Sequence, residues 1–189
     1  TFVNLMKYIK MATSFNFGEV VSVIIASIVL PFLPETPIQL LVEGLLYDFG
    51  QMTIPFDNVD KELIRKPKKL NIKSLKSFMF FMGPVSSLFD IVVFLLLWFV
   101  FTVRDVTHFQ TIWFTYSIVS NLIGMHIIRT AKIPFIQSKP AKPVILVTII
   151  GIILFTIMTI IPIGRFVGLT KMPLSYFAFL LLVVLLYIS

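Results

Sequence analysis

Long apolar runs separated by short polar links dominate the chain. A helix needs about 20 apolar residues to cross a bilayer, and runs close to that length occur six times. They cover approximately residues 8–30, 37–54, 78–101, 111–128, 144–163 and 174–188. This pattern predicts an all-α fold: a polytopic membrane protein built as a bundle of six transmembrane helices, in a single transmembrane domain that covers residues 1–189.

The boundary between the first two runs is the sharpest in the sequence. Thr36 followed by Pro37 is a helix-start signal, with threonine as the cap and proline at the first helical position. The link from Pro31 to Pro37 is too short to cross a bilayer. The first two runs are therefore predicted to form an antiparallel hairpin.

Composition excludes a soluble domain. Hydrophobic residues make up 58% of the chain, charged residues only 13%, and the mean hydropathy is +0.99. A net charge of +7 would suggest a nucleic-acid partner in a soluble protein, but here the basic residues lie between apolar runs. We therefore expect the lipid bilayer, and no nucleic acid, as a partner. The absence of cysteine excludes thiolate metal sites and disulfides.

The distribution of basic residues predicts orientation, because cytoplasmic segments of membrane proteins carry an excess of lysine and arginine. If the amino end is cytoplasmic, thirteen of the 16 lysines and arginines lie on the inner side. The inner set is Lys7, Lys10, Lys61, Arg65, Lys66, Lys68, Lys69, Lys73, Lys76, Arg129, Lys132, Lys139 and Lys142, and the outer set is Arg104, Arg165 and Lys171. The sequence thus predicts a multi-pass protein of the cell membrane with both ends and the loop from Asp57 to Lys76 in the cytoplasm.

Two acidic residues lie deep inside the first two apolar runs. Glu19 precedes Pro31 by twelve residues and Asp48 follows Pro37 by eleven, which places them roughly 18 Å and roughly 17 Å from the same membrane face at 1.5 Å per residue. A carboxylate near the midplane is costly and is by default a hypothesis of an ion or proton site. We predict that Glu19 and Asp48 face a shared cation site.

Neighbouring residues extend this candidate site. Asn16 is three residues from Glu19 and shares its helix face, whereas Gly44, Asp48 and Gln51 share a face of the second run. Local unwinding at Gly44 would supply backbone carbonyls. Oxygen ligands suit hard cations such as magnesium, calcium, sodium or protons, rather than copper or zinc. The alternative is a hydrogen bond between helices, from a protonated Glu19 to Asn16 or Asp48.

Two further acids are assigned weaker roles. Glu43 lies about 140° around an ideal helix from Asp48 and roughly 9 Å from the outer face, which favours a vestibule residue or a neighbour of Tyr47 over a central ligand. Asp90 also lies deep in its run, with Ser86 one turn earlier. A structural hydrogen bond is slightly favoured for Asp90, so it and Gln51 are weaker candidates for metal binding.

Catalytic motifs are missing from the chain. It has no glycine-rich phosphate loop followed by Lys-Ser/Thr and no Ser-His-Asp arrangement. We therefore assign no catalytic or cofactor-binding residue. Thr1 in place of methionine and an apolar run that reaches Ser189 lead us to expect a piece of a longer polypeptide.

Several segments resemble the carboxyl-terminal membrane half of P-type cation ATPases, from the fifth to the tenth membrane helix. The similarity extends over essentially the whole chain, and the bacterial magnesium-transporting branch is the most similar. The segments that carry it are 7–10, 16–19, 30–34, 37–41, 47–48, 51–52, 55–60, 83–90 and 129–138.

The resemblance implies a pump that hydrolyses ATP through domains absent from this chain, and it implies magnesium as the transported ion and as the partner of ATP in the parent protein. Asn16, Glu19 and Asp48 match positions that ligate the transported ion in this family. Gly44 stands where the family usually has an asparagine ligand, and Tyr116 where magnesium-branch members tend to have a glutamate.

The expected function is therefore the ion-translocation domain of a P-type cation pump, with the remaining pump domains and a hard cation as partners. Two alternatives stay open. The same acids could serve a self-contained six-span channel or a proton-coupled carrier that works without ATP. The chain could also be a membrane module that binds a partner and transports nothing.

Overall fold

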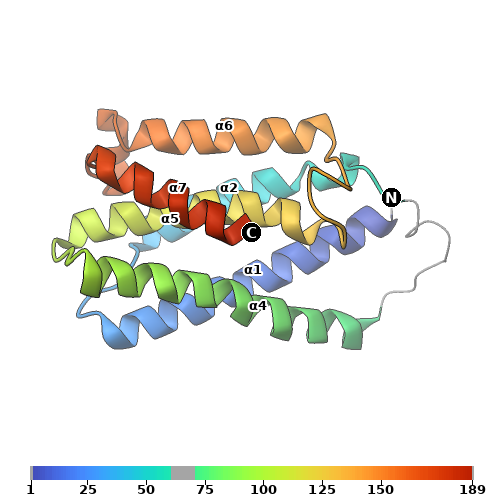
Figure 1. Cartoon of the computed structure of the whole chain (residues 1–189), viewed down its shortest axis with the longest axis horizontal. Helices are drawn as coiled ribbons and strands as arrows, with labels where there is room; N and C mark the ends of the chain where they lie inside the picture. The colour runs from blue at the N-terminus through green and yellow to red at the C-terminus, as the bar shows by residue number, and fades with distance from the viewer. Residues whose placement is uncertain (1, 61–70, 189) are drawn as a thin grey trace.

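The chain folds into helices that run side by side along one axis (Figure 1). The computed structural model describes residues 2–60 and 71–188, and within them it contains no β-strand, only an isolated bridge between Pro134 and Ser138. The all-α class predicted from the sequence is confirmed. The α-helices are α1 (Phe2–Val29), α2 (Pro37–Gln51), α4 (Ile72–Leu95), α5 (Val106–Ile128), α6 (Lys142–Met158) and α7 (Leu174–Ile188). Shorter helical segments are η1 (Ile54–Phe56), the π-helical turn η2 (Leu96–Val100) and η3 (Pro162–Val167).

Helix α5 is the centre of the bundle. It contacts α1, α2, α4, α6 and α7, and 67% of its most apolar 18-residue stretch is buried, against 28% for α1. Helices α1 and α4 form the most extensive pair. A protein-facing α5 and a largely outward-facing α1 follow from this arrangement.

Three helical segments are long and apolar enough to cross a membrane: Phe2–Val29, Ile72–Val100 and Val106–Ile128. Helix α6 is apolar but shorter. The predicted run 144–163 extends past the end of α6 at Met158, because Pro162 begins the separate segment η3. There Gly164 packs so closely that a Cβ on it would lie 2.0 Å from the Met158 carbonyl oxygen.

Side-chain caps mark the start of α2, α4 and α5. Thr36 accepts a hydrogen bond from the Gln39 N–H, and the Gln39 side chain accepts one from the Thr36 N–H, so α2 begins with the predicted threonine cap and Pro37. Asn71 caps α4 and Asp105 caps α5. Those two caps start the helices several residues before the apolar runs at 78 and 111.

Small residues allow α1 and α4 to approach closely. A Cβ on Gly18 would lie 2.3 Å from Ser86 Oγ and 3.0 Å from the Gly83 carbonyl oxygen. The Ser87 hydroxyl donates to the Gly18 carbonyl oxygen at 2.8 Å. Helix α4 continues through Pro84. The close approach at Gly18 fixes the height of the neighbouring Glu19 relative to α4.

The basic residues divide between the two ends of the bundle. The amino terminus and the link from α5 to α6 lie at one end, and the link from α1 to α2, the link from α4 to α5 and the segment from α6 to α7 lie at the other (Figure 1). Arg104, Arg165 and Lys171 belong to the second end. Lys61, Arg65, Lys66, Lys68 and Lys69 of the predicted inner loop fall outside the described residues.

A buried ion pair network closes the first of these ends. Asp57, just after η1, accepts hydrogen bonds from Lys7 Nζ at 2.7 Å and from Arg129 Nη1 at 3.0 Å. The Ala141 N–H also donates to Asp57 at 3.1 Å. The side chains of Asp57 and Arg129 are fully buried. This network ties together α1, the end of α2, the end of α5 and the start of α6.

Candidate cation site

Helix α1 presents Asn16 and Glu19 on one face, as their spacing predicts. Asn16 is exposed and Glu19 is half-buried. Both line an open hollow of about 310 Å³, whose other walls are apolar side chains of α1 together with Leu40 of α2. An amide oxygen and a carboxylate are therefore available on one surface.

The predicted residues of helix α2 differ in exposure. Asp48 is exposed, whereas Gln51 is fully buried. Neither side-chain atom of Gln51 has a hydrogen-bond partner among the described residues. The expected unwinding at Gly44 is wrong: α2 is continuous from Pro37 to Gln51, so the carbonyls near Gly44 lie in a regular helix.

The acids that the structure brings to Glu19 are Glu35 and Glu43. One carboxylate oxygen from each of Glu19, Glu35 and Glu43 lies within 4.8 Å of the others. Glu35 and Glu43 are 2% and 1% exposed. Glu43 is therefore a buried residue and not one of a solvent-facing vestibule.

The error has a simple geometric origin. The depth comparison assumed that both helices reach the membrane face at Pro31 and Pro37. Glu35 immediately precedes the Thr36 cap, yet its carboxylate meets that of Glu19, ten residues before the end of α1 at Val29. The link therefore folds back along α1, so α2 begins deeper than α1 ends, and Glu43 is brought level with Glu19.

Helix α5 supplies the partners of Glu43. Ser117 Oγ and Asn121 Nδ2 both donate to Glu43 Oε1, the latter at 2.8 Å. Glu43 Oε2 and both oxygens of Glu35 accept no hydrogen bond from the described residues. Among the described residues, no ion pair involves the cluster.

Asp90 lies in a different environment. The Ser22 hydroxyl donates to its Oδ2 at 2.5 Å, and the Tyr116 hydroxyl donates to its Oδ1 at 3.1 Å. Both carboxylate oxygens are thus engaged by protein groups, one from α1 and one from α5. This arrangement supports the structural hydrogen-bond role that the sequence slightly favoured, with Tyr116 as a partner.

A polar stripe on α2 is the signal that the sequence interpretation missed. Glu35, just before the helix, and Gln39, Glu43, Tyr47 and Gln51 of α2 follow one another at intervals of four residues, so that each helical member lies next to the following one. All five are buried, with at most 6% of any of them exposed. Polar residues at this spacing in an otherwise apolar helix predict an inward-facing polar stripe. The contributions of Ser117 and Asn121 had no comparable signal.

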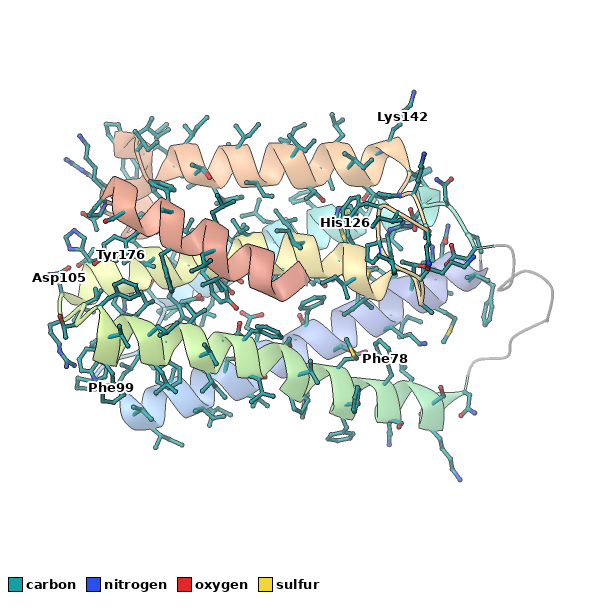
Figure 2. All side chains as sticks on the ribbon, viewed as in Figure 1. Phe78, Phe99, Asp105, His126, Lys142 and Tyr176 are labelled. Atoms are coloured by element: carbon teal, nitrogen blue, oxygen red, sulfur yellow. The ribbon has the colours of Figure 1, made fainter. Side chains whose placement is uncertain are left out.

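Figure 2 labels side chains toward the two ends of the bundle. Asp105 and Tyr176 lie at one end, and His126 and Lys142 lie at the other. The glutamate cluster is built from α1, the α1–α2 link and α2, and α5 holds it in place. Chemically, it offers several hard oxygen ligands in a buried setting, which suits binding of a hard cation.

Comparison with known proteins identifies the family. A family model described as "Cation transporting ATPase, C-terminus" matches residues 32–189. The "Magnesium-transporting ATPase, P-type 1" of Salmonella typhimurium (strain LT2) is 45% identical over 192 residues, which cover 100% of this chain and 21% of that protein. The protein of the same name from Escherichia coli (strain K12) is 47% identical over 183 residues, which cover 95% of this chain and 20% of that protein. The chain spans about a fifth of the length of these relatives, and it belongs to the carboxyl-terminal membrane region of the cation-transporting P-type ATPases.

Proposed function

We propose that this chain is the ion-translocation domain of an ATP-driven magnesium pump. The observation that carries the proposal is the similarity along the whole chain to proteins named magnesium-transporting ATPases. Asn16 and Glu19 on α1 and Asp48 on α2 offer the oxygen ligands that a hard cation requires. Phosphorylation and ATP binding belong to other domains of the parent protein, because the chain carries none of the motifs for them.

The proposed ligand set is the one expected from the sequence without the backbone of Gly44, which lies in the regular helix α2: Asn16, Glu19 and Asp48, with Gln51 and Asp90 as weaker candidates. Asn16 and Asp48 are exposed on α1 and α2. Apolar residues on the same outward faces, such as Ile24 and Leu45, are exposed as well. We assign this surface to the remaining membrane helices of the pump, which would complete the ion site by packing there.

In the bilayer, α1, α2, α4, α5, α6 and α7 would each cross once, as a single domain with both ends in the cytoplasm. Exposed isoleucine and leucine side chains, such as Ile28 and Leu146, support a lipid-facing or helix-facing exterior. The cell membrane is the proposed location.

ATP-driven transport is the first expected result. The full-length pump, reconstituted into sealed vesicles, should move Mg²⁺ across the membrane only when ATP is present on the side of the catalytic domains. A magnesium-sensitive dye enclosed in the vesicles measures this movement. Magnesium flux of equal rate without ATP would favour the self-contained channel or carrier, and no flux in either condition would favour the non-transporting module.

Topology gives a second expected result. Cysteines introduced singly as Asp105→Cys and Lys142→Cys, at opposite ends of the bundle (Figure 2), should react with an impermeant reagent from opposite sides of the membrane. Both positions are exposed, so the reagent can reach them. Lys142→Cys should react from the cytoplasmic side, because basic residues concentrate at that end. Reaction of both from one side would contradict the proposed topology.

A further inference from the structure

The buried glutamate cluster differs from the proposed ligand set. Asn16 and Asp48 are exposed, whereas Glu35 and Glu43 are almost completely buried. Glu19 is the one residue that belongs to both groups. The cluster therefore calls for its own explanation.

No basic side chain among the described residues pairs with the cluster. Lys7 and Arg129 pair with Asp57, and His108 pairs with Asp105. Like charges within 4.8 Å of one another repel strongly in a buried setting. The three acids can therefore all be ionised only with a bound cation, and without one they must hold protons.

The hydrogen bonds favour a cation. Ser117 and Asn121 both donate to Glu43 Oε1 and so orient its carboxylate. Glu43 Oε2 remains buried without a partner among the described residues, as do both oxygens of Glu35. Buried polar atoms of this kind normally have a partner, and a metal ion is one that satisfies several of them at once.

The spacing also fits. Ligand oxygens on opposite sides of one ion lie about 4.6–5.2 Å apart for Ca²⁺ and about 4.0–4.2 Å apart for Mg²⁺. The three carboxylate oxygens lie within 4.8 Å of one another. One divalent cation can therefore contact all three acids after little or no closure.

We propose that Glu19, Glu35 and Glu43 form a second binding site for a hard divalent cation, with Glu35 and Glu43 as ligands outside the proposed transport set. Ser117 and Asn121 are positioning residues that fix the Glu43 carboxylate. This inference rests on the proposed function only for the class of ion. The site itself is defined by the buried geometry between α1, the α1–α2 link, α2 and α5.

The test is equilibrium binding of Mn²⁺, a spectroscopic probe with the same preference for oxygen ligands. Full-length pump without nucleotide is titrated, and the paramagnetic resonance signal of free Mn²⁺ gives the number of bound ions. Glu35→Gln and Glu43→Gln should each lower the affinity for one of the bound Mn²⁺ ions by about tenfold or more. Each variant removes a ligand charge while keeping the side-chain size. Competition by Mg²⁺ and by Ca²⁺ in separate titrations distinguishes the two natural ions.

Matched variants separate this proposal from the proposed function. Asp48→Asn should leave the ion of the glutamate site bound with unchanged affinity, and the exposed Asp105→Asn should leave every ion bound. An affinity within about twofold of the unmodified pump in either glutamine variant overturns the second site. If Glu43→Gln elutes as aggregate, Glu35→Gln decides alone. If the glutamine variants lose an ion and Asp48→Asn changes the affinity for none, the second site is supported. The assignment of Asp48 as a ligand of the transported ion is then contradicted.

Discussion

Replacing Asp57 with alanine is expected to destabilise the membrane domain by about 3–5 kcal/mol, the largest stability effect of any single change considered. The substitution leaves Lys7 and Arg129 buried without their shared counter-charge. It also removes the acceptor of the Ala141 N–H. Thermal inactivation of the full-length pump in detergent, followed by size-exclusion chromatography, measures the loss.

The effect should depend on pH in a defined direction. Burial alone raises the pKa of Asp57, but the hydrogen bond from Lys7, the Ala141 N–H and the charges of Lys7 and Arg129 outweigh it and hold the pKa below the usual 3.8. A folded-state pKa below the unfolded value gives stability that is fully present above about pH 3.8 and is lost as pH falls through the folded value. The difference between the unmodified protein and Asp57→Ala should therefore be constant near neutrality and shrink in strong acid.

An exposed acid provides the control. Asp105 is exposed and pairs with His108 at 2.8 Å on the surface. Asp105→Ala should lower stability much less than Asp57→Ala, because solvent replaces the lost partner. Equal inactivation temperatures for Asp57→Ala and the unmodified pump would show that the buried pairs contribute nothing net.

Helix starts were predictable because they depend on local chemistry. The capping box at Thr36 and Gln39 and the proline at position 37 act within one turn, and α2 begins there. The face shared by Asn16 and Glu19 follows from helix geometry alone. Features of this kind depend only on residues that are close together in the sequence, so the sequence alone is enough to predict them.

The partner of Glu19 was not predictable by the same means. It depends on how far the α1–α2 link folds back, which is decided by tertiary packing of Glu35 against α1 rather than by any local signal. Depths counted in residues from the link put Asp48, and not Glu43, at the level of Glu19. The four-residue polar stripe on α2 would have indicated the buried face, because it uses no assumption about depth.

The largest functional effects are expected from Glu19→Gln and Asp48→Asn in the full-length pump. Each removes one unit of charge from the proposed transport site while keeping the size of the side chain. A unit charge about 4 Å from an ion contributes on the order of 4 kcal/mol per cation charge at an effective dielectric constant of 20. We therefore expect the magnesium concentration that half-activates ATP hydrolysis to rise at least about a hundredfold, measured as phosphate release against free Mg²⁺.

The two variants should then differ in a second readout. Glu19 also belongs to the buried cluster, so Glu19→Gln should lower the Mn²⁺ affinity of both the transport site and the glutamate site. Asp48 is exposed on α2, and Asp48→Asn should lower the affinity of the transport site alone. Asp105→Asn should leave half-activation unchanged. Activation of ATP hydrolysis by Mg²⁺ depends on the ligands of the ion that is moved. Normal activation in Asp48→Asn together with lost activation in Glu43→Gln would therefore show that the transport site lies at the buried polar stripe of α2 and not on its outward face.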